Sequence, residues 1–351
     1  MKTQEKGIMV HSSVATGKRL RRFFAHTEFY MILVIIALIA VVTTISPRFL
    51  SGENLFSIAL SSSYTGIFSI GFLFVLITGG LDISFLAVAT VAQYLTAMVM
   101  VAHPQAPIWF VIALPLVLGV AMGAINTLLI HYLNAPSMII TIATQSIFYG
   151  LLQFATHGEW LYNFPDWFVH FPRILVLSFV NERGVKYGLS IIVVIWLAVA
   201  LVASIILRHI KVGRRLYALG GNLEASHRAG IGILRYRFFA YCACGFTAGL
   251  GGLVHSFITQ TVAPNTLVGN EFTVVAAVVL GGASIFGGTG SIGGSILGVA
   301  VIALITNALT IMKVPNYWHA VCIGGVVLLS MSITALSGRL AARGEKKINV
   351  E

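Results

Sequence analysis

Charged residues are scarce in this sequence. Only 9% of its 351 residues are Asp, Glu, Lys or Arg, and 58% are hydrophobic, whereas soluble domains contain about 25% charged residues. No polar block is long enough to form a soluble domain of its own. The composition therefore excludes a soluble enzyme or a soluble binding module and predicts a single polytopic membrane domain.

Cysteines and acidic residues are also few. The three cysteines, Cys242, Cys244 and Cys322, lie inside apolar runs and show neither metal-ligand spacing nor a disulfide pattern. The chain has 22 Lys and Arg against 11 Asp and Glu, a net charge of +11. Nucleic-acid-binding proteins are also basic, but here the basic residues are not interleaved with stacking aromatic residues. We therefore predict no metal site and no nucleic-acid partner.

The motifs of ATP hydrolysis and of covalent catalysis are missing. Gly17-Lys18 lacks the upstream glycine and the following Ser or Thr of a phosphate-binding loop. The stretch from Gly288 to Gly293 has the glycine spacing of a dinucleotide-binding loop, but no acidic residue follows about 20 positions later. We predict that the chain has no catalytic residues and no cofactor of its own, and that it is not an enzyme.

Apolar runs recur along the chain at about the 20-residue length that a helix needs to cross a bilayer. They predict an all-α integral membrane fold of about ten transmembrane helices, several of them short or interrupted by glycine. The runs lie near residues 29–46, 55–78, 83–102, 108–131, 137–156, 187–207, 238–262, 272–287, 291–312 and 318–336. The chain then divides into a basic arm (1–28), one transmembrane domain (29–336) and a tail (337–351).

Lysine and arginine gather at three places in the sequence. Six lie in the arm, seven between residues 208 and 237, and four in the tail. Such clusters mark the cytoplasmic side of a membrane protein, and ten spans put both termini on one side. We predict a multi-pass inner-membrane protein whose termini and loop 208–237 are cytoplasmic.

The longest segment on the predicted outer side, residues 157–186, is rich in aromatic residues. It either docks a partner or forms an interfacial aromatic belt with a re-entrant or surface helix.

A short internal sequence similarity suggests an inverted repeat. Gly119-Val120-Ala121 matches Gly298-Val299-Ala300, and Asn134-Ala135-Pro136-Ser137 aligns with Lys313-Val314-Pro315-Asn316 at the same offset. Under the predicted topology the two stretches run in opposite directions, as in inverted-repeat transporters. The matches are short enough to arise by chance.

Glycines recur every four residues at Gly290, Gly294 and Gly298. On one face of a helix this spacing predicts close packing against another helix, with lipid around both. The preceding pairs Gly281-Gly282 and Gly287-Gly288 predict a broken helix whose free backbone groups line a buried or watery space.

Two acidic residues lie where apolar runs begin. Asp82 and Glu271 are candidates for a translocation path, because an ionisable residue near lipid is usually functional. Each is equally suited to cap a helix or to interact with its dipole. Four amides inside the apolar runs are further path candidates, although hydrogen bonds between helices explain them as well. They are Gln93, Asn126, Gln145 and Asn307.

The basic loop 208–237 contains a readable polar pattern. Asn222 precedes the helix formers Glu224, Ala225 and Ala229, and Gly230 follows. The order predicts a short helix that is capped by the asparagine and ended by the glycine.

Three stretches of the chain resemble bacterial ABC-importer permeases of the ribose, or monosaccharide, type. They are the basic segment from Gly213 to Ile231, the element Gly79-Gly80-Leu81-Asp82-Ile83-Ser84, and the glycine-rich block from Glu271 to Ser291. The resemblance covers residues 30–335. Residues 80–85 and Glu159-Trp160 are also similar to the autoinducer-2 import permeases.

The resemblance implies the membrane-spanning subunit of an importer for a monosaccharide or a related small polyol. Its implied partners are ABC ATP-binding subunits that use the ATP, an extracytoplasmic solute-binding protein, and a second permease that is either identical or a sister chain. Residues 222–231 resemble a coupling helix that sits in a cleft of the ATPase. The implied coupling residues are Gly213, Arg214, Gly221, Asn222, Glu224, Ala225, Gly230 and Ile231.

Two other classes of function compete with this interpretation. An ion-coupled secondary transporter of a small polar solute normally has acidic or histidine residues deep in several spans, and here only Asp82 and Glu271 qualify. A membrane receptor or assembly scaffold would show no transport in reconstituted vesicles.

Overall fold

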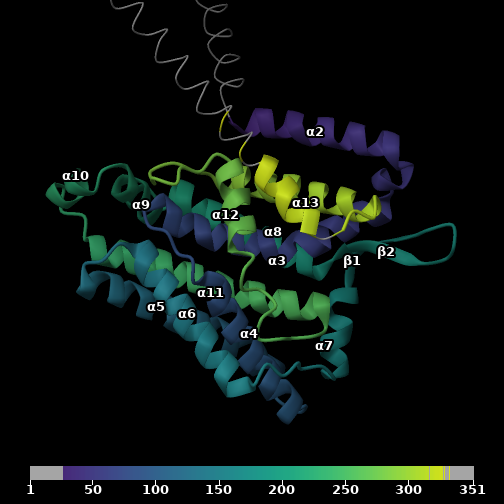
Figure 1. Cartoon of the computed structure of the whole chain (residues 1–351), viewed down its shortest axis with the longest axis horizontal. Helices are drawn as coiled ribbons and strands as arrows, with labels where there is room; N and C mark the ends of the chain where they lie inside the picture. Colours follow the sequence, from purple (N-terminus) through teal and green to yellow (C-terminus); the bar gives the residue numbers. More distant parts are fainter. Residues whose placement is uncertain (1–26, 316, 327, 329–331, 333–351) are drawn as a thin grey trace, which may run out of the picture.

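The computed structural model describes residues 27–315, 317–326, 328 and 332 (Figure 1). The structure does not describe residues 1–26 of the predicted arm or any of the predicted tail 337–351. In the last predicted span, 318–336, it describes residues 318–326, 328 and 332. The elements are α2 (Thr27–Ile45), η1 (Pro47–Leu50), α3 (Gly52–Ile77), α4 (Phe85–Ala102), α5 (Ile108–Leu133), α6 (Ser137–Thr156), α7 (Asp166–His170), η2 (Phe171–Arg173), β1 (Leu175–Val180), β2 (Lys186–Ser190), α8 (Ile191–His209), α9 (Lys211–Gly221), α10 (Leu223–Arg228), α11 (Ile233–Thr259), α12 (Glu271–Leu280) and α13 (Ile292–Ile311).

Seven helices in the described residues are long and apolar enough to cross a membrane. They are α3, α4, α5, α6, α8, α11 and α13. The prediction of a helical, multi-pass membrane protein is confirmed, and the count of about ten spans is not. The apolar parts of α2 and α12 are shorter, and eight residues of the last predicted run, 318–336, lie outside the described residues.

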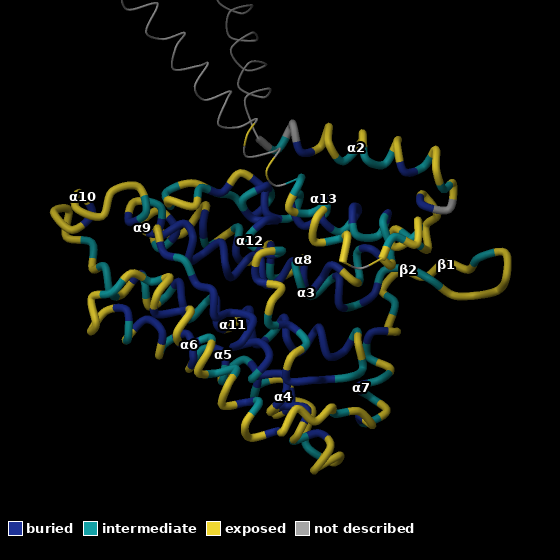
Figure 2. The backbone as a smooth tube through the Cα atoms, in the orientation of Figure 1, coloured by how far each residue is buried: buried dark blue, intermediate teal, exposed yellow. Residues whose placement is uncertain are grey.

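Helices α3, α4 and α11 are the most buried of the seven candidate spans, and α3 and α11 lie near the centre of the molecule (Figure 2). Helices α5 and α6 lie at the periphery and expose large apolar side chains such as Val117 and Leu151, which are 64% and 63% exposed. A soluble protein avoids apolar patches of this extent. Lipid or a second membrane chain is therefore the expected environment of these faces.

Glycines let α5 and α11 approach backbone to backbone. A Cβ atom on Gly119 would lie 2.0 Å from the Gly245 carbonyl oxygen, and a Cβ on Gly245 would lie 2.0 Å from that of Gly119. Gly123 and Gly249, one turn further along each helix, make equally close approaches. This spacing is a common means of packing helices in lipid, and the sequence interpretation missed it here.

The second glycine-rich contact joins α12 and α13. A Cβ on Gly294 or Gly298 would lie 2.0 or 1.9 Å from the carbonyl oxygens of Gly281 and Ala277. Gly290 does not belong to this helical face, because α13 begins only after the N-cap Ser291. The predicted three-glycine face is wrong at that position.

Helix α12 is too short to be the predicted span 272–287. It ends at Leu280, and Gly281 to Ser291 form an irregular segment in which Gly282, Gly287 and Gly288 have positive φ angles. Ten helical residues extend about 15 Å, half of the hydrocarbon core. The run is therefore a half-helix followed by a loop, as the paired glycines indicate.

The segment after α6 departs from the all-α prediction. Residues 187–190, predicted to begin a helix, instead belong to an antiparallel hairpin of β1 and β2. Residues 175–180 are mostly apolar and include β-branched and aromatic residues that favour a strand. The turn is closed by Asn181, whose side-chain oxygen accepts from the backbone N–H of Arg183 and Val185.

The positions that are paired in the predicted repeat have similar local geometry. Gly119 and Gly298 each lie against a carbonyl oxygen of a neighbouring helix. Asn134 and Lys313 each have a left-handed backbone, with φ of 49° and 57°. These likenesses are consistent with a repeat whose copies include α5 and α13.

The hairpin and the α9–α10 segment lie at opposite ends of the molecule (Figure 1). We call the end that carries α9 and α10 the basic end. The break between α3 and α4 (residues 78–84) and the loop after α12 also reach this end, because both contact α9.

Candidate coupling surface and polar sites

Helix α10 projects at the basic end as a short, exposed helix. The side-chain oxygen of Asn222 accepts a hydrogen bond from the Ala225 backbone N–H at 2.9 Å. Gly230 follows the C-cap residue Ala229 with φ of +74°, a conformation that glycine adopts at little cost. The predicted asparagine cap and glycine end are confirmed.

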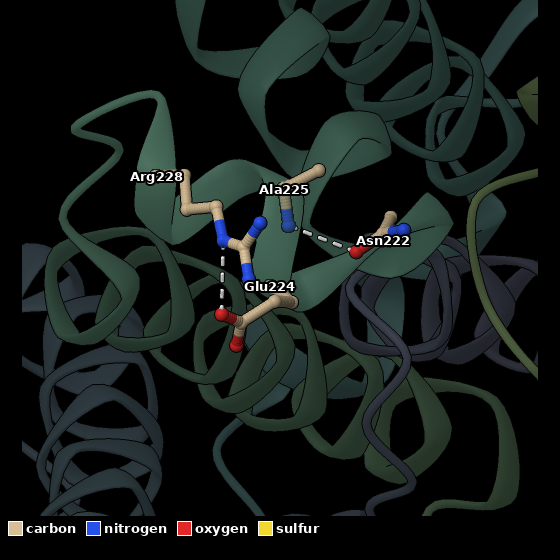
Figure 3. A network of polar contacts seen from close by, with 4 residues as sticks. All are labelled: Asn222, Glu224, Ala225 and Arg228. Carbon is tan, nitrogen blue, oxygen red and sulfur yellow. Dashed lines mark hydrogen bonds and ion pairs between the residues drawn. The ribbon is translucent and has the colours of Figure 1, made fainter.

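The exposed face of α10 carries an ion pair and small side chains (Figure 3). Arg228 Nε lies 3.2 Å from Glu224 Oε1, one turn away, and both side chains are more than 70% exposed. An exposed pair of this kind stabilises a helix by about 0.3–0.5 kcal/mol. Ser226 is the one buried residue of α10, so the rest of the helix is free to contact another protein.

Helix α9 anchors α10 to the membrane domain. Its buried residues Gly213, Leu216 and Leu219 face the protein, and a Cβ on Gly213 would lie 2.4 Å from the Leu207 carbonyl oxygen. Gly213 is therefore a packing residue, whereas Arg214, Gly221 and the residues of α10 other than Ser226 are exposed. Ile231 is half-buried.

A hydrogen bond ties α9 to the loop after α12. The Tyr217 hydroxyl donates to the Gly290 carbonyl oxygen at 2.7 Å. Burial raises the pKa of the Tyr217 hydroxyl above its ordinary value, so it remains protonated and able to donate. The sequence interpretation gave Tyr217 no role.

Three distant segments meet at glycines beside α9. A Cβ on Gly220 would lie 1.9 Å from the Ile77 carbonyl oxygen, and a Cβ on Gly287 would lie 2.6 Å from Gly79 Cα. The Gly288 N–H donates to the same Ile77 oxygen at 3.0 Å. Helix α9 therefore contacts both the 78–84 break and the loop after α12. These contacts are made by backbone atoms, which cannot rotate away as side chains do.

The six predicted path residues form four separate hydrogen-bonded groups. In the first, Asp82 is buried and its Oδ1 accepts from the backbone N–H and the hydroxyl of Ser84. Ser84 in turn accepts from the Asn126 side-chain amide at 2.7 Å. The bond from the N–H two residues on gives Asp82 the geometry of a turn at the start of α4, which supports its structural role.

The second group centres on buried Glu271 in the first turn of α12. Its carboxylate accepts from the Gly269 N–H at 2.9 Å and from the Gln145 side-chain amide at 2.8 Å. The start of a helix favours a negative charge. Glu271 therefore links α12 to α6.

The other two groups join amides to partners on other helices. Gln93 Oε1 lies 3.2 Å from buried His255 Nδ1, and Asn54 and Asn307 exchange two hydrogen bonds of 3.0 Å. The ring of Tyr64 packs edge-on against that of His255. All these contacts fit hydrogen bonding between helices, and together they do not outline a single path.

Metal chemistry has no support in the described residues. No cluster of three or more His, Cys, Asp and Glu side chains is found there, and the three cysteines are free. The absence of metal and cofactor sites remains a prediction.

Comparison with known proteins identifies the family. The model of the family described as "branched-chain amino acid transport system / permease component" matches residues 54–331. The chain is 29% identical over 316 residues to the ribose import permease protein RbsC of Haemophilus influenzae, covering 89% of this chain and 94% of that protein. It is 29% identical to the D-allose transport system permease protein AlsC of Escherichia coli, covering 92% and 97% of the two chains.

A third relative is the autoinducer 2 import system permease protein LsrC of Photorhabdus luminescens, 28% identical and covering 91% of this chain and 92% of that protein. No solved structure matches. These relatives confirm the predicted resemblance to ribose-type import permeases. The family match covers well over half of the sequence, and the chain therefore belongs to this family of transport-system permease components.

Proposed function

We propose that this chain is the membrane-spanning permease subunit of an ABC importer for a monosaccharide or a related small polyol. The relatives named for ribose, D-allose and autoinducer 2 import all align over about nine-tenths of the chain. A solute class shared by these relatives supports a small, hydroxyl-rich substrate.

The exposed, capped helix α10 is the observation that carries the proposal. It presents small and charged side chains at the basic end, and α9 joins it through backbone contacts to both helix breaks. A protein bound to α10 is thereby placed to act on the membrane domain. The proposed partner there is an ATP-binding subunit.

The remaining partners follow from the same proposal. A solute-binding protein delivers substrate to the end that carries the β1–β2 hairpin, and a second permease, identical or a sister chain, completes the path in the membrane. Both termini and the basic end face the cytoplasm. The chain itself binds no cofactor, since ATP is used by the partner subunit.

Substitutions on α10 test the proposal. Ala225→Arg places a long cation on an exposed position without removing the backbone N–H that Asn222 caps, so the membrane domain folds but the ATPase docks poorly. A loss of about 1.4 kcal/mol in docking weakens binding tenfold. We expect less co-purified ATPase and slower ATP-driven uptake in proteoliposomes, at unchanged permease yield.

The matched control is Ala102→Arg. Ala102 is also exposed and ends α4 at the helix terminus remote from the 78–84 break. It is expected to retain the bound ATPase. If Ala225→Arg retains ATPase and uptake as fully as this control does, α10 is not the docking site.

The alternative, an ion-coupled transporter, depends on Asp82 and Glu271. Both carboxylates are buried, yet each accepts a hydrogen bond from a backbone N–H beside the start of a helix, that of Ser84 for Asp82 and that of Gly269 for Glu271. This geometry supports structural roles. The decisive comparison between the two functions is uptake with ATP and uptake with an ion gradient.

A further inference from the structure

A small polar cavity lies at the basic end, apart from α10. It is enclosed by the 78–84 break, the connection between α5 and α6, and the start of α11, and has a volume of about 230 Å³. That is below the 300–1,000 Å³ of drug-sized pockets. The cavity therefore suits a solute no larger than a single sugar ring.

A buried hydroxyl without a partner lines this cavity. Tyr241 is 1% exposed, and its hydroxyl makes no hydrogen bond of normal geometry among the described residues, although the Ser137 side chain is near enough to interact with it. Gly80 borders the same cavity, and a Cβ there would lie 2.8 Å from the Tyr241 hydroxyl. Leaving such a group unpaired costs about 1–3 kcal/mol. The hydroxyl lies beneath the 78–84 break, so a small displacement of Gly80 would let a ligand hydroxyl reach it and remove that cost.

Two further polar side chains complete the lining. Arg237 precedes Tyr241 by one helical turn, is half-buried, and has no carboxylate within ion-pair distance in the described part of the chain. The Ser137 hydroxyl accepts the Leu81 N–H at 3.0 Å and keeps its own proton to donate. Guanidinium, phenol and serine hydroxyl together supply several donors and an acceptor.

The chemistry of this lining fits a neutral polyhydroxylated solute. Sugar hydroxyls accept from Arg237 and Tyr241, and the apolar side of the ring can pack on Ile130 and Pro136. Inorganic phosphate would match Arg237 but leave the apolar wall uncovered.

We propose that this cavity is an inner binding site for one monosaccharide, occupied from the cytoplasmic side, through which accumulated sugar slows import. The identity of the solute rests on the proposed function. Gly79 lines the cavity and also lies against Gly287 and Gly220. A ligand that binds this arrangement of the 78–84 break more tightly than alternative arrangements stabilises it. The contact of Gly79 with α9 links this arrangement to the ATPase-docking helix α10.

Binding to the purified full-length chain tests the site, with D-ribose and D-allose as the probes. We expect saturable binding by calorimetry and a sugar-dependent rise in the midpoint of thermal unfolding. Tyr241→Phe removes only the unpaired hydroxyl, so the sugar-free protein should be as stable as wild type or more stable. Its sugar affinity should fall about tenfold.

Arg235→Gln is the matched control for Arg237→Gln. The two arginines lie two residues apart at the start of α11, but Arg235 is exposed and does not line this cavity. Only Arg237→Gln should weaken sugar binding. A purely structural role for Tyr241 would instead lower the stability of Tyr241→Phe without sugar and leave the affinity unchanged.

Transport gives a second readout in proteoliposomes that hold the complete importer. Excess sugar on the ATP side should slow wild-type uptake, and Tyr241→Phe should need about tenfold more sugar for the same fractional slowing. If the wild-type importer transports with ATP but shows neither sugar binding to the permease nor slower uptake with excess sugar, the inner site is refuted and the proposed function is not. Failure of ATP-driven transport itself would instead refute the proposed function.

Discussion

Substitution of Gly298 by alanine tests how tightly the half-helix α12 is held against α13. An ordinary contact begins at about 3.4 Å, whereas the new Cβ would lie 1.9 Å from the Ala277 carbonyl oxygen and 3.1 Å from the Gly281 backbone nitrogen. The two backbones would have to separate by about 1.5 Å, which is the difference between the ordinary 3.4 Å and the 1.9 Å to the Ala277 carbonyl oxygen. No side-chain rotation relieves a clash with a carbonyl oxygen of the neighbouring helix.

The energetic cost follows from two opposing effects. Overpacking in a well-packed interior costs about 1–3 kcal/mol, and a backbone displacement of this size belongs at the upper end. Alanine regains about 1 kcal/mol of helix propensity over glycine. We expect Gly298→Ala to lose about 2 kcal/mol of stability.

Gly293→Ala provides the control in the same helix. The nearest atom to a Cβ at Gly293 is Glu28 Oε1, at an ordinary 3.4 Å, so this variant should match or exceed wild-type stability. Thermal unfolding of both variants in one detergent, followed by tryptophan fluorescence, compares them directly. Equal midpoints for Gly298→Ala and Gly293→Ala would refute the close α12–α13 packing.

Three further substitutions test single interactions. Asn222→Ala removes the cap of α10 and should cost that helix about 1 kcal/mol, seen as faster amide exchange in α10, whereas Asn222→Asp retains the cap; equal exchange in both would contradict the capping role. Glu271→Ala leaves the Gln145 amide without its acceptor and should destabilise the protein by about 1–3 kcal/mol, with a smaller loss for Glu271→Gln; the same unfolding midpoint in the two variants would argue against the hydrogen bond. Asn307→Ala breaks two bonds to Asn54, and a double-mutant cycle over this pair should give a coupling of about 1 kcal/mol; strict additivity would show that the pair does not interact.

Local sequence patterns predicted the parts of the fold that depend on neighbouring residues. Long apolar runs located α3, α5 and α13 to within a few residues, because hydrophobicity is the main signal that a segment enters a bilayer. Asn222 and Gly230 predicted the ends of α10, because capping involves atoms only a few positions apart.

Features that depend on contacts between residues far apart in the chain could not be predicted from the sequence. The Gly119–Gly245 approach and the cavity around Tyr241 require segments more than 100 residues apart to meet. The β1–β2 hairpin was missed because a short strand pair lacks the length and apolar signal of a span. Glu271 and Gln145 were each found as polar residues, but only the fold shows that they bind one another.

We propose that the energy for transport enters from an ATPase docked on α10. The most direct test of this proposal is uptake of D-ribose or D-allose by proteoliposomes that contain the permease, with and without the co-purified ATP-binding subunit. If the energy enters in this way, uptake occurs only when that subunit, the solute-binding protein and ATP are present together, and an imposed proton or sodium gradient drives none. Gradient-driven uptake by this chain alone would contradict the proposal and establish an ion-coupled transporter.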